Sequence, residues 1–100
     1  MTTITRDDDK IVLRLESDLV ASRVPEVKKQ LKELVDTGHR VAVDLADVHM
    51  VDSTGIGLLM AAHNSLQKND HSLIVLNASE DIRKLFQTMR LDQRFIMGEP

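Results

Sequence analysis

The stretch VAVDLADVHMVDSTGIGLL, residues 41–59, decides how the chain folds. It begins with an apolar run that leads into Asp44, and a polar loop then ends at Asp52. From Ile56 onward apolar residues return with a different period. A short, nearly all-apolar run indicates a strand buried on both faces, and the later period indicates a helix. We therefore predict a strand over 41–45, a connecting loop, and a helix whose first turn carries the Ser53 hydroxyl.

Upstream of this unit, the pattern predicts an antiparallel hairpin. Ile11, Leu13 and Leu15 alternate with other residues, as in a strand with one buried face. The polar residues 7–10 form a turn, and the segment around Ile4 is short enough to pair as an edge strand.

A helix is predicted over 23–37, between the hairpin and the central strand. Pro25 suits its first turn, where the missing N–H removes no intrahelical bond. Gly38 suits a left-handed residue that ends the helix. The apolar residues expected on its buried face are Val24, Val27, Leu31, Leu34 and Val35.

The second half of the chain repeats the alternation. A buried strand is predicted over 73–76, and a third helix follows with Ser79 as its N-cap. A short strand or apolar tail over 91–96 closes the fold, and residues 98–100 are expected to fray. In the helix after Ser53, we expect His63 to lie at the edge of the core.

This order predicts an α/β fold with a mixed, mainly parallel sheet, because alternating strands and helices form parallel βαβ units while the hairpin adds an antiparallel pair. About three to four helices are expected. With 100 residues and no repeat or linker, we expect a single domain over 1–100.

The composition narrows the classes of function. A net charge of -3 and only two aromatic residues disfavour nucleic-acid binding. The absence of cysteine excludes disulfides and thiolate chemistry. The start of the chain is polar and no apolar run approaches the length of a membrane span, so we expect a cytoplasmic protein without membrane insertion.

Four kinds of chemistry fit the residues poorly. The histidines have no common metal-ligand spacing, so no metal site is predicted. Gly55 and Gly57 lack the rest of a phosphate-binding loop. Residues 51–55 lack the first glycine of a nucleophile elbow. Asp44 ends a strand as a phospho-acceptor would, but the acidic run 7–9 lies in the hairpin turn, so Asp44 is read as a loop or capping carboxylate. No cofactor is expected.

Ser53 leaves two interpretations open. The first amide groups of a helix favour anions, so a phosphate on Ser53 would be tolerated there and would repel a docked partner. Serine is also a common N-cap, and the residues alone favour that role. Gly55 and Gly57 in the opening turns lower helix propensity, which suggests that the backbone there is approached closely or packs closely on the strand.

The run Val43 to Leu59 resembles the signature of STAS domains, specifically bacterial anti-sigma factor antagonists. Their pattern is a strand that ends in Asp-Leu, a loop, and then Asp-Ser-Ser/Thr-Gly-hydrophobic-Gly. The resemblance covers almost the whole chain, including 77–79 and 85–95. One segment departs from the family: it usually carries Gly-Glu/Asp-Leu-Asp before the first helix, where this chain has Ser17-Asp18-Leu19-Val20.

The resemblance implies a non-enzymatic partner switch. Family members bind an anti-sigma factor, which is a serine kinase of the histidine-kinase-like ATPase type, and a PP2C-type phosphatase reverses the phosphorylation. The phosphorylated serine maps onto Ser53. The residues expected to bind the partner are Asp18, Asp52, Ser53, Thr54, Gly55, Ile56 and Gly57. The alternative is a constitutive scaffold or regulatory subunit of a signalling or lipid-transport complex, in which Ser53 is only a helix cap.

Overall fold

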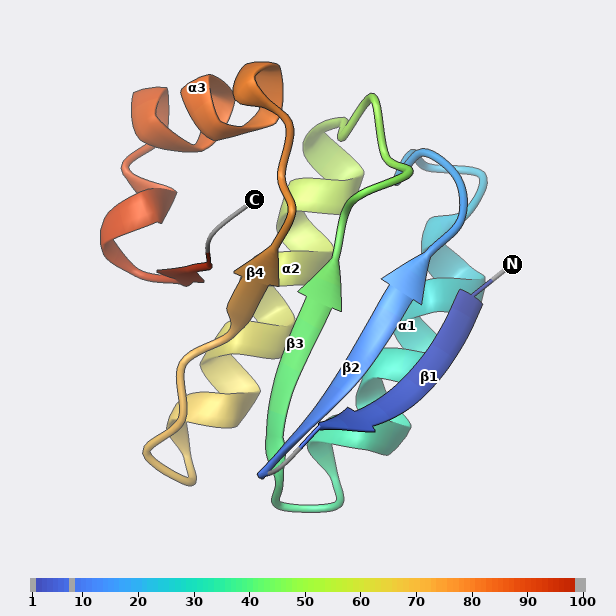
Figure 1. Cartoon of the computed structure of the whole chain (residues 1–100), viewed down its shortest axis with the longest axis vertical. Coiled ribbons are helices and arrows are strands. Elements are labelled where there is room, and N and C mark those ends of the chain that lie inside the picture. Colours follow the sequence, from blue (N-terminus) through green and yellow to red (C-terminus); the bar gives the residue numbers. More distant parts are fainter. Residues whose placement is uncertain (1, 8, 99–100) are drawn as a thin grey trace.

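A computed structural model of the chain describes residues 2–7 and 9–98 and shows a five-stranded sheet. The strands lie in the order β1-β2-β3-β4-β5. Two helices lie behind the sheet in Figure 1, and a third stands beside its upper end. The elements are β1 Thr2–Asp7, β2 Lys10–Leu15, α1 Val24–Val35, β3 Arg40–Asp44, α2 Ser53–Gln67, β4 Ile74–Leu76, α3 Glu80–Thr88, the 3-10 helix η1 Leu91–Gln93, and β5 Ile96–Met97.

The strand pairing confirms the predicted mixed sheet. Only β1 and β2 pair antiparallel, with Ile4 opposite Leu13, whereas every later pair is parallel. The parallel strands therefore present their carboxyl ends at one edge of the sheet, which is the upper edge in Figure 1. The hairpin turn lies at the opposite edge, because Lys10 pairs with Arg40 at the start of β3.

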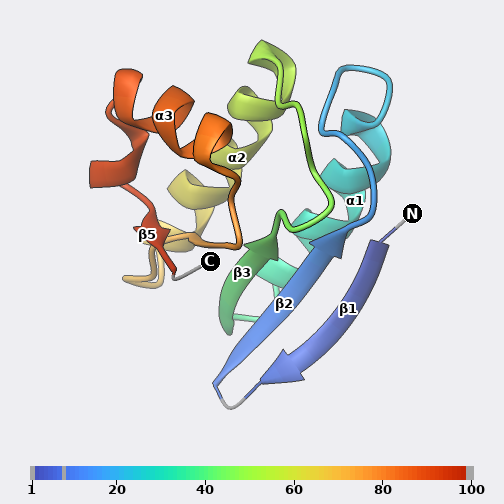
Figure 2. The ribbon, with the colours of Figure 1, turned by 45° about the horizontal axis from the view of Figure 1, so that its top comes forward.

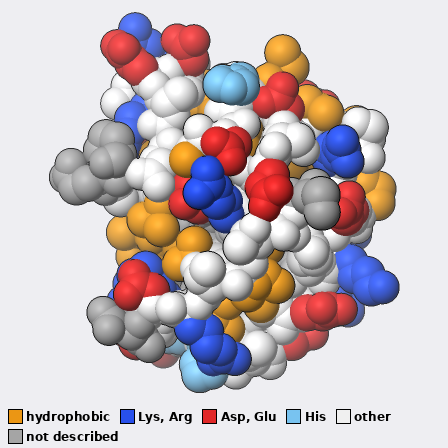
Figure 3. Space-filling view, turned by 45° about the vertical axis from the view of Figure 1, so that its right-hand side comes forward, with side chains coloured by type: hydrophobic (Ala, Val, Ile, Leu, Met, Phe, Trp, Pro, Cys, Tyr) orange, Lys and Arg blue, Asp and Glu red, His pale blue; other side chains and the backbone are white. Residues whose placement is uncertain are grey.

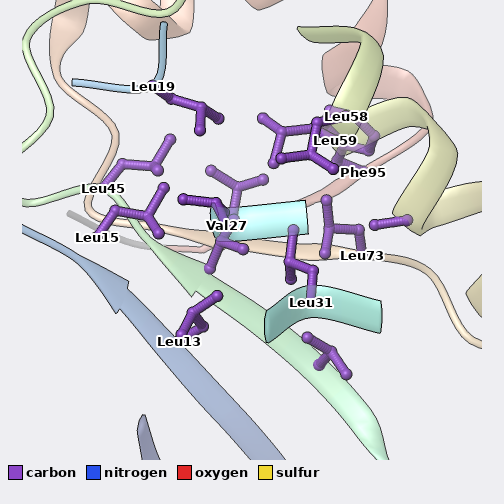
Figure 4. Packing of buried hydrophobic residues seen from close by; sticks show 14 of the residues in the cluster. Leu13, Leu15, Leu19, Val27, Leu31, Leu45, Leu58, Leu59, Leu73 and Phe95 are labelled. Atoms are coloured by element: carbon purple, nitrogen blue, oxygen red, sulfur yellow. The ribbon is translucent and has the colours of Figure 1, made fainter. Parts of the chain in front are cut away.

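One aliphatic core fills the space between the sheet and the helices. Leu13 on β2, Leu31 on α1 and Leu59 on α2 are each at most 1% exposed. Figure 4 shows these side chains converging with Leu73 and Phe95 from the second half of the chain. Each side chain of this size contributes roughly 1.5–3 kcal/mol when it leaves water, so this core is the main stabilising element.

The local predictions hold with small shifts of boundary. Pro25 lies in the first turn of α1, and Gly38 adopts a φ of +81° just after it. Ser79 caps α3 by accepting a hydrogen bond from the Ile82 amide at 3.2 Å.

Two predictions about individual residues are wrong. His63 is 4% exposed and lies inside the core, where its Nδ1 accepts a hydrogen bond from the Leu73 amide at 3.1 Å. Gly98 is not frayed, because its amide donates to the Val75 carbonyl at 2.7 Å. The remaining two residues of the predicted frayed end, 99 and 100, lie outside the described residues.

Candidate functional site

The predicted site residues meet at the carboxyl edge of the parallel strands. Two loops reach this edge, residues 16–23 after β2 and residues 45–52 after β3, and the first turn of α2 follows the second loop. Figure 2 shows these two loops standing side by side above the sheet. We call the two loops together with residues 53–57 the Ser53 surface.

Backbone hydrogen bonds extend the sheet into these loops. Leu19 forms an isolated parallel bridge with Val51. The Leu19 amide donates to the Met50 carbonyl at 3.0 Å, and the Asp52 amide donates to the Leu19 carbonyl at 3.2 Å. Leu19 is fully buried beneath this bridge, so its side chain anchors the first loop to the core.

Asp18 ties the loops together a second time. Its Oδ1 atom accepts hydrogen bonds from two consecutive amides, His49 at 2.7 Å and Met50 at 3.1 Å. Hydrogen bonds to a charged acceptor are among the stronger ones in proteins. The residue predicted to contact a partner therefore also holds the shape of the second loop.

Asp52 makes the third connection and is the N-cap of α2. Its Oδ1 accepts from the Gly55 amide at 2.9 Å, and its Oδ2 accepts from the Ala21 amide at 2.9 Å. The hydrogen bond from the Gly55 amide, and to a smaller extent the one from the Ala21 amide, lowers the pKa of the Asp52 carboxyl below its ordinary value. Asp52 is consequently a carboxylate at neutral pH, directly before Ser53.

The capping role proposed for Ser53 is wrong. Helix α2 begins at Ser53, so the residue that caps it is the preceding one, Asp52. Ser53 and Thr54 are both exposed, and within the described residues neither hydroxyl takes part in a hydrogen bond. The Ser53 hydroxyl therefore contributes no hydrogen bond to the described part of the structure.

The next three residues divide between the interior and the surface. Gly55 and Ile56 are buried, whereas Gly57 is exposed. A β-carbon on Gly55 would collide with the Leu19 carbonyl oxygen, which confirms the close approach expected there. A β-carbon on Gly57 would meet nothing within 4 Å, so close packing within this chain does not explain the second glycine.

The other acidic candidates are separated by the fold. Asp44 accepts hydrogen bonds through Oδ1 from the Ala46 amide and the Asn77 side chain, both at 3.0 Å, as expected of a loop carboxylate. Asp7 and Asp9 lie at the hairpin turn, at the other end of the strands from Asp44. The hairpin acids therefore stand apart from Asp44, as their place in the sequence indicated.

The two loops of the Ser53 surface carry more carboxylates than basic side chains. Figure 3 shows carboxylates over much of the upper half of one face, with fewer basic groups between them. The carboxylates contributed by the two loops are Glu16, Asp18, Asp47 and Asp52. Arg14 neutralises one of them, since its Nη2 lies 2.8 Å from the Asp47 carboxylate.

Sequence reasoning missed two features of this surface. Met50 in the second loop is 58% exposed, so a large apolar side chain faces solvent there. The Ala21 amide donates a hydrogen bond to Asp52, which lies 31 positions further along the chain. Aspartate before a helix is a known capping signal, so the cap at Asp52 was predictable from the sequence. The exposure of Met50 and the hydrogen bond of Ala21 had no such local signal.

Comparison with known proteins shows the family of the chain. The family model for the STAS domain matches residues 1–99. The chain belongs to the STAS family. A protein of Staphylococcus epidermidis named anti-sigma-B factor antagonist is 40% identical over 98 residues, which cover 97% of this chain and 90% of that protein.

Solved STAS structures share the fold. An anti-sigma factor antagonist from Mycobacterium paratuberculosis superimposes with a TM-score of 0.88 at 19% identity, covering 100% of this chain and 86% of that one. The Bacillus cell fate determinant SpoIIAA, solved in its phosphorylated form, gives a TM-score of 0.75 at 20% identity, covering 99% of this chain and 92% of that one. None of the helices formed by the described residues is both long and apolar enough to cross a membrane.

Proposed function

We propose that this STAS protein is an anti-sigma factor antagonist, controlled by phosphorylation of Ser53. The observation that carries the proposal is the free Ser53 hydroxyl on a surface that is otherwise held firmly in place. Asp52 provides the cap and the loop connection, so modification of Ser53 would break no hydrogen bond within the described residues. The domain then acts as a ligand and substrate of other proteins rather than as a catalyst.

Charge explains how the switch would operate. A phosphate adds about -1.5 to -2 charges at neutral pH. The helix start provides free amide groups that tolerate this charge, so the fold survives. Because the Asp52 carboxylate lies beside it, the phosphorylated surface would be strongly negative and would repel a partner that docks there.

The proposed partner is an anti-sigma factor that is also the serine kinase, of the histidine-kinase-like ATPase type, with a PP2C-type phosphatase that restores binding. The Staphylococcus epidermidis relative supports this proposal through its name. The phosphorylated form of SpoIIAA, a protein of the same fold, also supports it. These partners imply a cytoplasmic location, and the family match over 1–99 supports one domain over 1–100.

Binding contacts are proposed for the exposed part of the Ser53 surface. Ser53, Thr54 and Gly57 are exposed and would face the partner directly. Gly55 and Ile56 are buried, so their contribution is to place these neighbours. Asp18 and Asp52 would contact the partner, since they are partly exposed, and would also place their neighbours by holding the loops together.

The alternative is a constitutive scaffold. The scaffold alternative assumes that Ser53 is a helix cap, but the residue that caps α2 is Asp52. It still predicts a complex that survives treatment with the kinase, whereas the switch predicts dissociation.

The test is phosphorylation of the purified protein by its cognate anti-sigma kinase with ATP, followed by intact mass measurement. We expect one added phosphate on the wild type and none on Ser53→Ala, with Thr54→Ala as the matched control that still accepts it. Titration calorimetry with the kinase should show weaker binding of Ser53→Asp. A phosphate that persists in Ser53→Ala would overturn the site.

A further inference from the structure

The bridge between the two loops of the Ser53 surface has an inner and an outer face. Leu19 and Val51 form the bridge and are 0% and 7% exposed, so their side chains belong to the core. Residues that flank a bridged pair point to the opposite face, because side chains alternate along an extended chain. The flanking residues are Asp18, Val20, Met50 and Asp52, and all four are partly or fully exposed. The outer face therefore carries two apolar side chains and two carboxylates.

Val20 and Met50 are diagonal neighbours across this bridge. Val20 follows Leu19 on the first loop, whereas Met50 precedes Val51 on the second. At a rise of about 3.3 Å per residue and a spacing of about 4.8 Å between strands, their α-carbons are about 8 Å apart. Long side chains interact across such a diagonal. We call these two residues the Val20–Met50 patch.

The backbone holds both residues of the patch in place. The Met50 amide donates to Asp18 Oδ1 at 3.1 Å, and the Met50 carbonyl accepts from the Leu19 amide at 3.0 Å. The Val20 carbonyl accepts from two amides at the start of α1, at 2.8 and 3.1 Å. Met50 is nevertheless 58% exposed. An apolar side chain on a fixed backbone has less freedom to lose when a partner binds, which favours affinity.

The carboxylates of the outer face are already engaged within the chain. Asp18 uses Oδ1 for two amides of the second loop. Asp52 uses one oxygen for the Gly55 amide and the other for the Ala21 amide. Three of these four carboxylate oxygens therefore accept hydrogen bonds from the backbone, whereas the exposed part of the Val20–Met50 patch is open to a partner.

We propose, as an extension that rests on the proposed function, that the Val20–Met50 patch is the contact by which the anti-sigma kinase recognises this chain, with Met50 seated in an apolar pocket of the kinase. The patch is continuous with the phosphorylation site, because Ser53 follows Asp52, and Asp52 and Val20 are the residues that follow the bridged pair. Methionine is enriched in protein interfaces, and charged residues are depleted at their centres.

The patch would also set specificity. Val20 is the position at which this chain departs from the aspartate of the family pattern. A kinase that meets an aspartate there would leave its own polar group unpaired against Val20, and should bind this chain less tightly.

The test is calorimetric titration of the whole protein with the kinase that phosphorylates Ser53, at several temperatures. Met50→Gln keeps the length of the side chain but makes it polar, and we expect the affinity to fall about tenfold or more. The heat capacity change of binding should become less negative, because less apolar area is buried. Met89→Gln is the matched control, since Met89 is 46% exposed at the end of α3, outside the Ser53 surface, and should bind within about twofold of the wild type.

Two further measurements make the result specific. Raising sodium chloride from about 50 to about 500 mM should leave the loss in Met50→Gln unchanged within about twofold, because salt screens charges and not apolar contacts. Val20→Thr keeps the shape of the side chain and should also weaken binding, by about threefold or more. The urea midpoints of both variants should stay close to that of the wild type, which separates a lost contact from a lost fold.

The outcomes separate this inference from the proposed function. Equal affinity of the Met50 and Met89 variants for a kinase that phosphorylates the wild type would overturn the patch alone. A loss that disappears at high salt would show that charge, and not an apolar pocket, makes the contact. A wild-type dimer that Met50→Gln dissociates in sedimentation velocity would overturn the choice of partner. Neither binding nor phosphorylation of the wild type would overturn the proposed function and the patch together.

Discussion

The carbonyl oxygen of Leu19 lies within the space that a β-carbon on Gly55 would need. The Leu19 carbonyl cannot withdraw, because it also accepts a hydrogen bond from the Asp52 amide at 3.2 Å. Its side chain is fully buried and fixes the loop from below. One contact thus sets the distance between the first loop and the start of α2.

Replacing Gly55 with alanine should therefore destabilise the protein. The collision involves backbone and a buried side chain, so we expect the free energy of unfolding to fall by roughly 1–3 kcal/mol, as in other overpacked sites. Gly57→Ala is the matched control, since open space surrounds Gly57 and alanine is the better helix former by about 1 kcal/mol. Urea denaturation should show opposite shifts of the midpoint, and a fall of equal size in both variants would contradict the argument.

Gly57 leads to a second prediction, which rests on the proposed function. A larger side chain there leaves the fold intact but stands on the exposed part of the Ser53 surface. Gly57→Leu should weaken binding of the cognate anti-sigma factor by about tenfold or more, a loss typical of a disturbed interface centre. Calorimetric titration measures this. Ala61→Leu, one turn further along α2, should leave that affinity unchanged, and equal losses in the two variants would count against a partner at Gly57.

The two amides held by Asp18 give a third prediction. Asp18→Ala removes the acceptor for the His49 and Met50 amides, so the free energy of unfolding should fall by roughly 1–3 kcal/mol. Glu33→Ala removes the same charge from an exposed position of α1, and we expect a change of less than about 0.5 kcal/mol. Amide hydrogen exchange should also accelerate at His49 and Met50 in the Asp18 variant. Unchanged exchange there would show that Asp18 does not hold this loop.

The sequence predicted the fold well because the fold depends on local patterns. Alternating apolar residues in β2, the apolar run of β3 and the stripe of α1 each carry their own period, and the order of elements then required parallel crossovers. The end residues shifted by one or two positions, as at Arg40 and Asp44, because strand ends depend on the neighbouring strand rather than on the residues themselves.

The site was less predictable because it depends on contacts between segments about 30 residues apart. Hydrogen bonds join Asp18 and Ala21 to the second loop, and such bonds produce no repeating pattern in the sequence. The error at Ser53 has a different origin. Two neighbouring residues, Asp52 and Ser53, are both good N-caps, and only the backbone decides between them. Asp52 has the extended φ and ψ of -90° and -178° that a cap requires.

Acid should weaken the connection that Asp52 makes. The pKa of Asp52 is lowered in the folded protein, chiefly by the Gly55 amide and then by that of Ala21. The stabilisation is therefore present above the ordinary value of 3.8 and is lost as the pH falls through the lower folded value. Asp52→Asn lacks this titration. The difference in urea midpoint between wild type and Asp52→Asn should be constant from about pH 7 to pH 5 and shrink toward about pH 3. A difference that does not vary with pH would contradict the role of the charge.

His63 should make stability depend on pH in a different range. Burial, and secondarily the charge of Arg94, lower the pKa of this imidazole below 6.5, and its Nδ1 must stay unprotonated to accept from the Leu73 amide. As the pH falls below about 6.5, the unfolded chain binds a proton that the folded chain resists, so stability declines. We expect the urea midpoint of the wild type to fall between about pH 7.5 and pH 5.5, and to fall less in His63→Gln. His39→Gln, at an exposed histidine, should keep the wild-type slope. If the His63 and His39 variants show the same slope, the decline arises elsewhere in the chain.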